Sequence, residues 1–75
     1  MMPTIKHLEQ TCFACPSQWE GETTDGKYIY IRYRWGYLSV DVDGKEIFGL
    51  HVGSNTGGVM SEKEMLEITG LRYVE

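Results

Sequence analysis

The sequence is poor in cysteine, proline and basic residues, and it contains no long apolar run. A helix that crosses a bilayer needs about 20 consecutive apolar residues, and no stretch of the chain approaches this length. The first ten residues, MMPTIKHLEQ, lack the apolar centre of a signal peptide. Since the two cysteines are also only three positions apart, we expect a cytoplasmic protein with reduced thiols and no membrane partner.

Basic residues are outnumbered, with seven lysines and arginines against eleven aspartates and glutamates and a net charge of -4. Bulk charge therefore does not favour nucleic acid as a partner. The hydrophobic content of 41% and aromatic content of 12% argue against disorder. A chain of 75 residues is one domain with a small core, and oligomerisation or a metal would add to its stability.

Two alternating runs, YIYIRYR and YLSVDV, flank a tight reversal at Trp35–Gly36. Alternation of this kind predicts strands with one buried and one exposed face. Asp-Gly-Lys occurs at 25–27 and again at 43–45, and we interpret both as three-residue hairpin loops. The sequence therefore predicts a four-stranded antiparallel meander that starts at Gln18.

These loops fix a register that gathers the aliphatic residues on one face. The predicted pairs are Thr23 with Ile29, Gly21 with Ile31, Trp19 with Tyr33, Tyr33 with Leu38, Ile31 with Val40, Ile29 with Val42, Val40 with Phe48 and Leu38 with Leu50. The predicted inner face comprises Trp19, Thr23, Ile29, Ile31, Tyr33, Leu38, Val40, Val42, Phe48, Leu50 and Val52.

One helix is predicted over 62–69, and it packs on this inner face. Ser61 and Glu64 form a capping box, Met60 and Met65 occupy the staple positions, and Gly70 provides the C-terminal stop.

The remaining segments complete the predicted fold. Residues 71–74 indicate a short final strand beside either the first or the fourth strand. Residues 1–16 are predicted to be an N-terminal arm that packs loosely or pairs at an edge, with 4–9 either a strand or a helical turn. Residues 53–58 are predicted to be a linker. The fold class is α+β, with the single domain spanning 17–75.

The opposite face of the meander carries a concentration of aromatic and arginine side chains. Tyrosine and arginine often anchor protein contacts, so this face predicts binding to another protein or to a second copy of the chain. The alternative is an ordinary solvated face whose cross-strand pairs each contribute about 0.2–1 kcal/mol. The candidate partner-binding residues are Tyr28, Tyr30, Arg32, Arg34, Tyr37, Ile47 and His51.

The predicted rows of this outer face argue against nucleic acid. They place Arg32 opposite Glu20, which cancels its charge, and Arg34 beside Tyr37 in a cation–π pair. A nucleic-acid-related role is retained as the alternative function. It is either single-strand binding by this face or acidic inhibition of a nucleic-acid enzyme, as in mobile genetic elements.

Cys12 and Cys15 have the spacing of half a zinc site. With His7 and His51 they could complete four ligands, or two chains could share four thiolates. Two reduced cysteines explain the motif more simply, so no metal or cofactor is expected. No serine or cysteine is placed beside a histidine by the predicted register, and we predict that the protein is not an enzyme.

Overall fold

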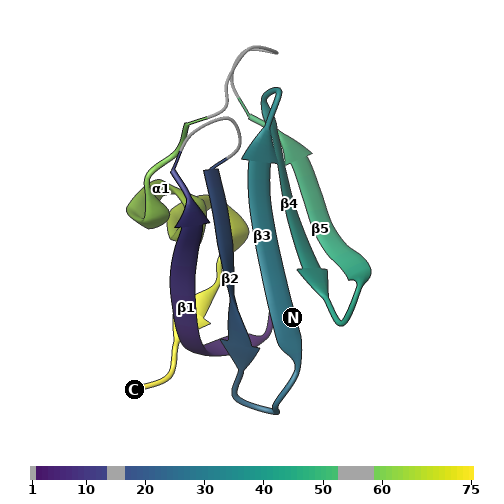
Figure 1. The fold of residues 1–75 in the computed structure, drawn as a ribbon, viewed down its shortest axis with the longest axis vertical. Coiled ribbons are helices and arrows are strands. Elements are labelled where there is room, and N and C mark those ends of the chain that lie inside the picture. Colours follow the sequence, from purple (N-terminus) through teal and green to yellow (C-terminus); the bar gives the residue numbers. More distant parts are fainter. Residues whose placement is uncertain (1, 14–16, 53–58) are drawn as a thin grey trace.

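The computed structural model describes residues 2–13, 17–52 and 59–75, which form one curled sheet and one helix (Figure 1). The sheet order is β5-β4-β3-β2-β1-β6. Strands β1 to β5 form an antiparallel meander, whereas β6 runs parallel to β1. The elements are β1 (Thr4–Cys12), β2 (Ser17–Thr23), β3 (Tyr28–Arg34), β4 (Tyr37–Val42), β5 (Lys45–His51), α1 (Glu62–Thr69) and β6 (Arg72–Tyr73).

The meander has one more strand than predicted, because the N-terminal residues belong to the sheet. Strand β1 pairs with β2 from Gln18 to Thr23 and buries Ile5 completely. Of the two alternatives for this segment, pairing at the edge of the meander is therefore confirmed and loose packing is wrong. The final strand also lies elsewhere than predicted. It pairs in parallel with β1, opposite Thr4 and Ile5, and therefore lies beside neither of the two strands considered. The result is a mostly-β half-barrel with one short helix.

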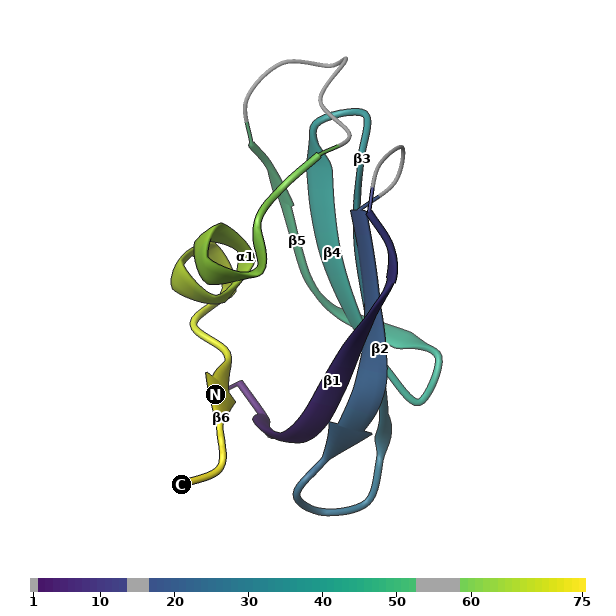
Figure 2. The ribbon, with the colours of Figure 1, turned by 60° about the vertical axis from the view of Figure 1, so that its left-hand side comes forward.

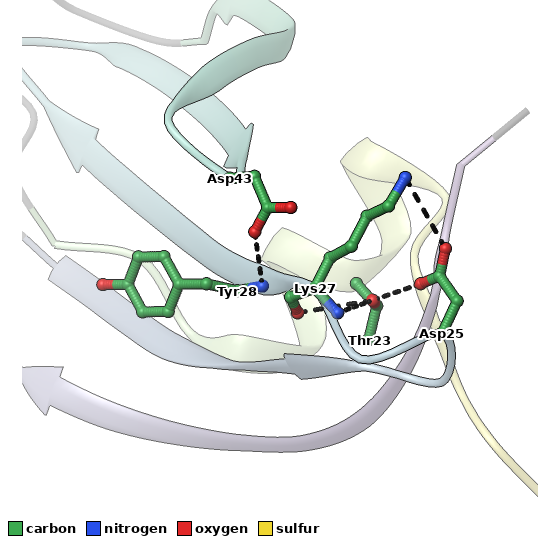
Figure 3. A network of polar contacts seen from close by, with 5 residues as sticks. All are labelled: Thr23, Asp25, Lys27, Tyr28 and Asp43. Atoms are coloured by element: carbon green, nitrogen blue, oxygen red, sulfur yellow. Dashed lines mark hydrogen bonds and ion pairs between the residues drawn. The ribbon is translucent and has the colours of Figure 1, made fainter.

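The central hairpin has the predicted register, with Ile31 opposite Val40. The first hairpin does not, because its loop lies at 24–26, one residue earlier. The Thr23 backbone N–H donates to the Lys27 carbonyl at 2.8 Å. The Thr23 hydroxyl accepts from the Lys27 N–H at 3.0 Å (Figure 3). Trp19 consequently pairs with Ile31 rather than Tyr33. Each pairing moves by two residues, so every side chain keeps its predicted face.

The second Asp-Gly-Lys turn has the predicted pairs, Val40 with Phe48 and Leu38 with Leu50, but a shorter loop. Asp43 and Gly44 form a two-residue turn with positive φ values of 51° and 82°, and a bulge before Phe48 restores the register. The Asp43 carboxylate accepts from the Tyr28 N–H at 3.0 Å (Figure 3). This bond ties the second loop to the start of β3.

The helix lies on the concave side of the sheet (Figure 2). Its bounds and caps are confirmed: the Ser61 hydroxyl accepts from the Glu64 N–H at 3.1 Å, and Gly70 ends it with φ 78°. Met60 and Met65 are both buried at its staple positions. Within the described ranges, no helix is long and apolar enough to span a membrane.

The predicted inner face forms most of the core, but burial decreases toward β5. Its residues on β2, β3 and β4 are buried or half-buried, whereas the Leu50 side chain on β5 is 47% exposed. Sequence analysis did not identify Ile5 and Leu71 as core residues, since they come from the two ends of the chain. The buried core comprises Ile5, Trp19, Ile29, Ile31, Tyr33, Leu38, Val40, Met60, Met65 and Leu71.

Candidate functional site

The convex outer face of the sheet points away from α1 (Figure 2). The predicted partner-binding residues share this face according to the strand pairing and the burial pattern. Strand β3 alternates between exposed or half-buried residues and buried ones, so four of the seven candidates project from this strand alone. Tyr37 on β4 and His51 on β5 are directly paired and extend the same face. Ile47 is the bulged residue of β5 and is 40% exposed. The structure therefore brings the predicted set together on one surface.

The tyrosine hydroxyls on this face are bonded within the sheet. Tyr28 donates to Glu20, and Tyr30 donates to the Gln18 side-chain oxygen at 2.9 Å. The Gln18 amide in turn donates to the Thr11 hydroxyl at 3.1 Å, which extends the polar network to β1. These bonds hold the rings in fixed orientations, so the face is preorganised for contact.

The bond between Tyr28 and Glu20 shifts the pKa of both groups. Because the hydroxyl donates to a carboxylate, the pKa of Tyr28 is raised to about 12, and desolvation adds to this effect. The same hydrogen bond is the largest cause that lowers the pKa of Glu20 below its usual value. The folded state thus favours protonated Tyr28 beside ionised Glu20.

We expect Tyr28→Phe to weaken the dependence of stability on pH at both extremes. The raised pKa of Tyr28 contributes stability below about pH 10 that is lost as the pH rises toward 12. The lowered pKa of Glu20 contributes stability that is lost as the pH falls below about 4.5. Thermal melts from acidic to alkaline pH should show a smaller decrease in melting temperature at both extremes for Tyr28→Phe than for the natural protein. Tyr30→Phe keeps the bond from Tyr28 to Glu20, so it should lose as much stability at acidic pH as the natural protein. Equal losses of stability at acidic pH in the two variants would contradict this assignment.

The predicted charge cancellation of Arg32 is wrong. Because the first hairpin is shifted, Arg32 lies opposite Gln18 and Ser39 rather than opposite Glu20. In the described part of the chain, neither Arg32 nor Arg34 has a carboxylate within ion-pair distance. Both side chains are exposed, so two positive charges on this face are available to a partner.

A compact group of Arg34, Trp35, Tyr37 and His51, which we call the Trp35 corner, lies at the β3–β4 turn. The Arg34 guanidinium lies 5.5 Å from the centroid of the Trp35 ring, so the cation–π partner is Trp35 and not the predicted Tyr37. The Tyr37 ring instead contacts His51, with centroids 4.9 Å apart. Trp35 is 63% exposed. Sequence analysis assigned Trp35 to the turn and so missed it as a site residue.

Gly49 and Glu46 hold Tyr37 in place, and sequence analysis did not identify either as part of the site. A Cβ at Gly49 would lie 1.8 Å from the Tyr37 hydroxyl oxygen, so the tyrosine side chain crosses β5 where there is no side chain. The hydroxyl then donates to Glu46 at 2.9 Å, and this bond raises the pKa of Tyr37.

The β1–β2 side of the outer face is acidic. Glu9 and Glu20 are directly opposite each other on β1 and β2, an arrangement of like charges that lowers stability. Glu22 pairs with His7 at 3.4 Å. Carboxylates also lie on the other side of β3, with Asp41 on β4 and Glu46 on β5, so the arginines of β3 are flanked by acidic residues on both sides.

The candidate metal ligands are not brought together in one chain. His7 is on β1 and His51 on β5, and three strands with a spacing of about 4.8 Å separate them. Cys12 ends β1, whereas Cys15 lies outside the described residues. In the parts of the chain that the structure describes, no three His, Cys, Asp or Glu side chains are grouped to hold a metal ion.

Comparisons with protein-family models, with curated proteins and with solved structures found no protein similar to this chain. Its function is therefore argued from the chemistry and geometry of the outer face.

Proposed function

We propose that this domain is a non-enzymatic module that binds another protein through the outer face of its sheet. The Trp35 corner is the anchor of this contact. The observation that carries the proposal is an exposed tryptophan in strained backbone at the tip of a hairpin, beside Arg34, which lacks a carboxylate partner in the described residues.

Trp35 occupies a position that favours other residues on structural grounds. Its φ is 55° and that of Gly36 is 73°, which matches a two-residue turn of the kind that prefers Asn-Gly or Asp-Gly. A bulky residue with positive φ is an outlier that the fold must stabilise. The side chain gains little burial in return, since 63% of it is exposed. A binding contact accounts for a tryptophan at this position, because tryptophan is enriched among energetic hot spots.

The charge pattern indicates the chemistry of the partner surface. Arg32 and Arg34 suit carboxylates that approach β3, whereas Glu9 and Glu20 on β1 and β2 suit basic groups. A convex surface with arginines between acidic residues is complementary to a flat or concave protein surface with the reverse pattern. It does not enclose a small substrate, which agrees with a binding role.

The variant Trp35→Asn tests this proposal, because it should remove the binding contact without destabilising the fold. Asn-Gly is favoured in this turn, so the variant should melt at the same temperature as the natural protein or higher. Tagged protein is used to capture partners from lysate of the source organism with and without nuclease. We expect a protein that survives nuclease and is lost with Trp35→Asn. Against the purified partner, the affinity should fall about 30-fold, as for a hot spot of about 2 kcal/mol.

Val59→Asn is the matched control, because it removes another highly exposed apolar side chain, 67% exposed, that lies outside the sheet. It should capture the same partner as the natural protein. Capture that is equally strong with Trp35→Asn and with Arg34→Ala would refute the proposed role of the Trp35 corner.

A second candidate is single-strand nucleic-acid binding at the same corner. The observation that favours it is the charge of Arg34 beside the exposed Trp35 ring, which can stack bases, with Arg32 on the same strand. Against it, a bound strand that continued across the face would meet Glu20 and Glu22. This alternative predicts that capture disappears with nuclease and that affinity for an oligothymidine falls steeply with added salt.

A further inference from the structure

Strand β5 is an open edge of the sheet. It ends the strand order, so its outer side pairs with no other strand among the described residues. The opposite edge, β6, has only two residues, whereas β5 has seven. Long open edges invite pairing with another chain unless they are protected by lysine, proline, a bulge or an inward-pointing charge. One edge of this sheet is thus short, and the other is long enough to pair.

The protective features of β5 are confined to its first half. Lys45 begins the strand, and the bulge lies at Ile47. From Phe48 to His51 the strand has regular register and neither lysine nor proline. Leu50 points to the inner face but is 47% exposed, and Phe48 on the same face is only half-buried. The second half of β5 therefore presents apolar side chains beside an open backbone.

The backbone groups that face outward can be identified from the β4–β5 pairing. The Val52 N–H donates to the Gly36 carbonyl at 2.6 Å, so the backbone N–H and C=O groups of Val52 point toward β4. Because backbone groups alternate in direction along a strand, the N–H and C=O groups of Leu50 and Phe48 also point toward β4. Gly49 and His51 consequently direct their N–H and C=O groups away from the sheet. These groups are the donors and acceptors that a further strand would use.

We infer that this edge pairs antiparallel with β5 of a second copy of the chain, about a twofold axis at Gly49. In that register Gly49 lies opposite Gly49 of the second copy, and both copies use their outward-facing groups. On the inner face, Phe48 of each copy contacts Leu50 of the other copy. The pairing covers the least buried part of the apolar inner face and makes one continuous sheet of two domains.

The outer side of this pairing is also complementary. His51 of the second copy comes beside Ile47, next to Glu46, so an imidazole approaches a carboxylate at both symmetric positions. At the axis, Gly49 presents no Cβ to the second copy, and the Tyr37 side chain of each chain fills the outer side of Gly49. These features select a second copy over an unrelated extended peptide, because the residues from Ile47 to His51 find their partners on the same segment of the second copy.

The dimer should be weak and concentration-dependent. Two short strands bury less than the about 1,200 Å² of a stable interface, so we expect association between the micromolar and millimolar ranges. The pairing shares His51 with the Trp35 corner but makes no use of Trp35 itself, and the inference does not depend on the proposed partner. Trp35→Asn should therefore leave the dimer unchanged.

Sedimentation equilibrium over this concentration range, combined with amide hydrogen exchange, tests the inference. The natural protein should approach the mass of two chains, and the Gly49 and His51 amides should gain protection as the concentration rises. Leu50→Lys places a charge on the inner face of the paired strands, so this variant should remain monomeric. Its Gly49 and His51 amides should then exchange freely at all concentrations. Val59→Lys, an equally drastic change at an exposed valine outside the sheet, should still dimerise.

Ile47→Lys provides a second disruptive variant on the other face of β5, in case Leu50→Lys perturbs the fold. A natural protein that stays monomeric at millimolar concentration would overturn the inference. So would a dimer whose Gly49 and His51 amides remain unprotected, because the contact would then lie elsewhere. A dimer that is lost with Trp35→Asn but persists with Leu50→Lys would assign self-association to the outer face instead.

Discussion

Gly21→Ala is expected to destabilise the fold by about 3 kcal/mol or more, which is at the upper end for overpacking. A Cβ at this position would lie 2.0 Å from the His7 carbonyl oxygen and 2.9 Å from the Leu8 Cα. These atoms belong to the backbone of β1, so the clash can be relieved only by moving the strand. A small domain has a total stability of about 5–15 kcal/mol, and this loss would detach β1 or unfold much of the population.

Gly49→Ala is the matched comparison for Gly21→Ala. Its Cβ would lie even closer to another atom, at 1.8 Å, but that atom is the hydroxyl oxygen at the far end of the Tyr37 side chain. The tyrosine can rotate away at the cost of its bond to Glu46, about 1 kcal/mol, and its ring contact with His51. Urea unfolding of both variants measures the difference. Equal losses would show that β1 does not lie across Gly21 as the structure places it.

Met65→Ala is the second change with a large expected effect, at about 2–5 kcal/mol. Met65 is completely buried between the helix and the sheet. An isolated helix of eight residues is not stable in water, so α1 depends on this packing. Loss of the methionine should release the helix and expose the inner face, since the remaining apolar helix residues Leu66 and Ile68 are only half-buried.

Glu67→Ala controls for the change in helix propensity, because Glu67 is exposed on the same helix and alanine is a slightly better helix former. Urea unfolding should show a near-unchanged midpoint for Glu67→Ala and a large decrease for Met65→Ala. A loss below about 1 kcal/mol for Met65→Ala would mean that the sheet is stable without the helix, and that α1 contributes little to the core.

The features determined by the sequence itself are those set by neighbouring residues. The helix begins and ends where predicted because Ser61 and Gly70 act within one turn of it. The central hairpin has its predicted register because Trp35 and Gly36 alone form the turn. Alternation along β3 then fixed which side chains share the outer face, and a shift of the first hairpin by two residues per pair did not alter the faces.

The tertiary structure decided the features that depend on distant residues. Strand β1 has no clean alternation because two register shifts, before His7 and before Cys12, interrupt its pairing with β2. The position of β6 depends on the docking of α1, since two residues carry too little pattern to choose an edge.

The loop position at the first Asp-Gly turn followed from a side chain, the Thr23 hydroxyl, that accepts the Lys27 N–H. The shifted hairpin places Arg32 opposite Gln18 instead of Glu20, and no carboxylate of the described residues lies within ion-pair distance of it. Local patterns thus specified which residues share a face. The partners of each residue across the sheet required the full fold, because pairing energy depends on contacts between segments that the sequence separates.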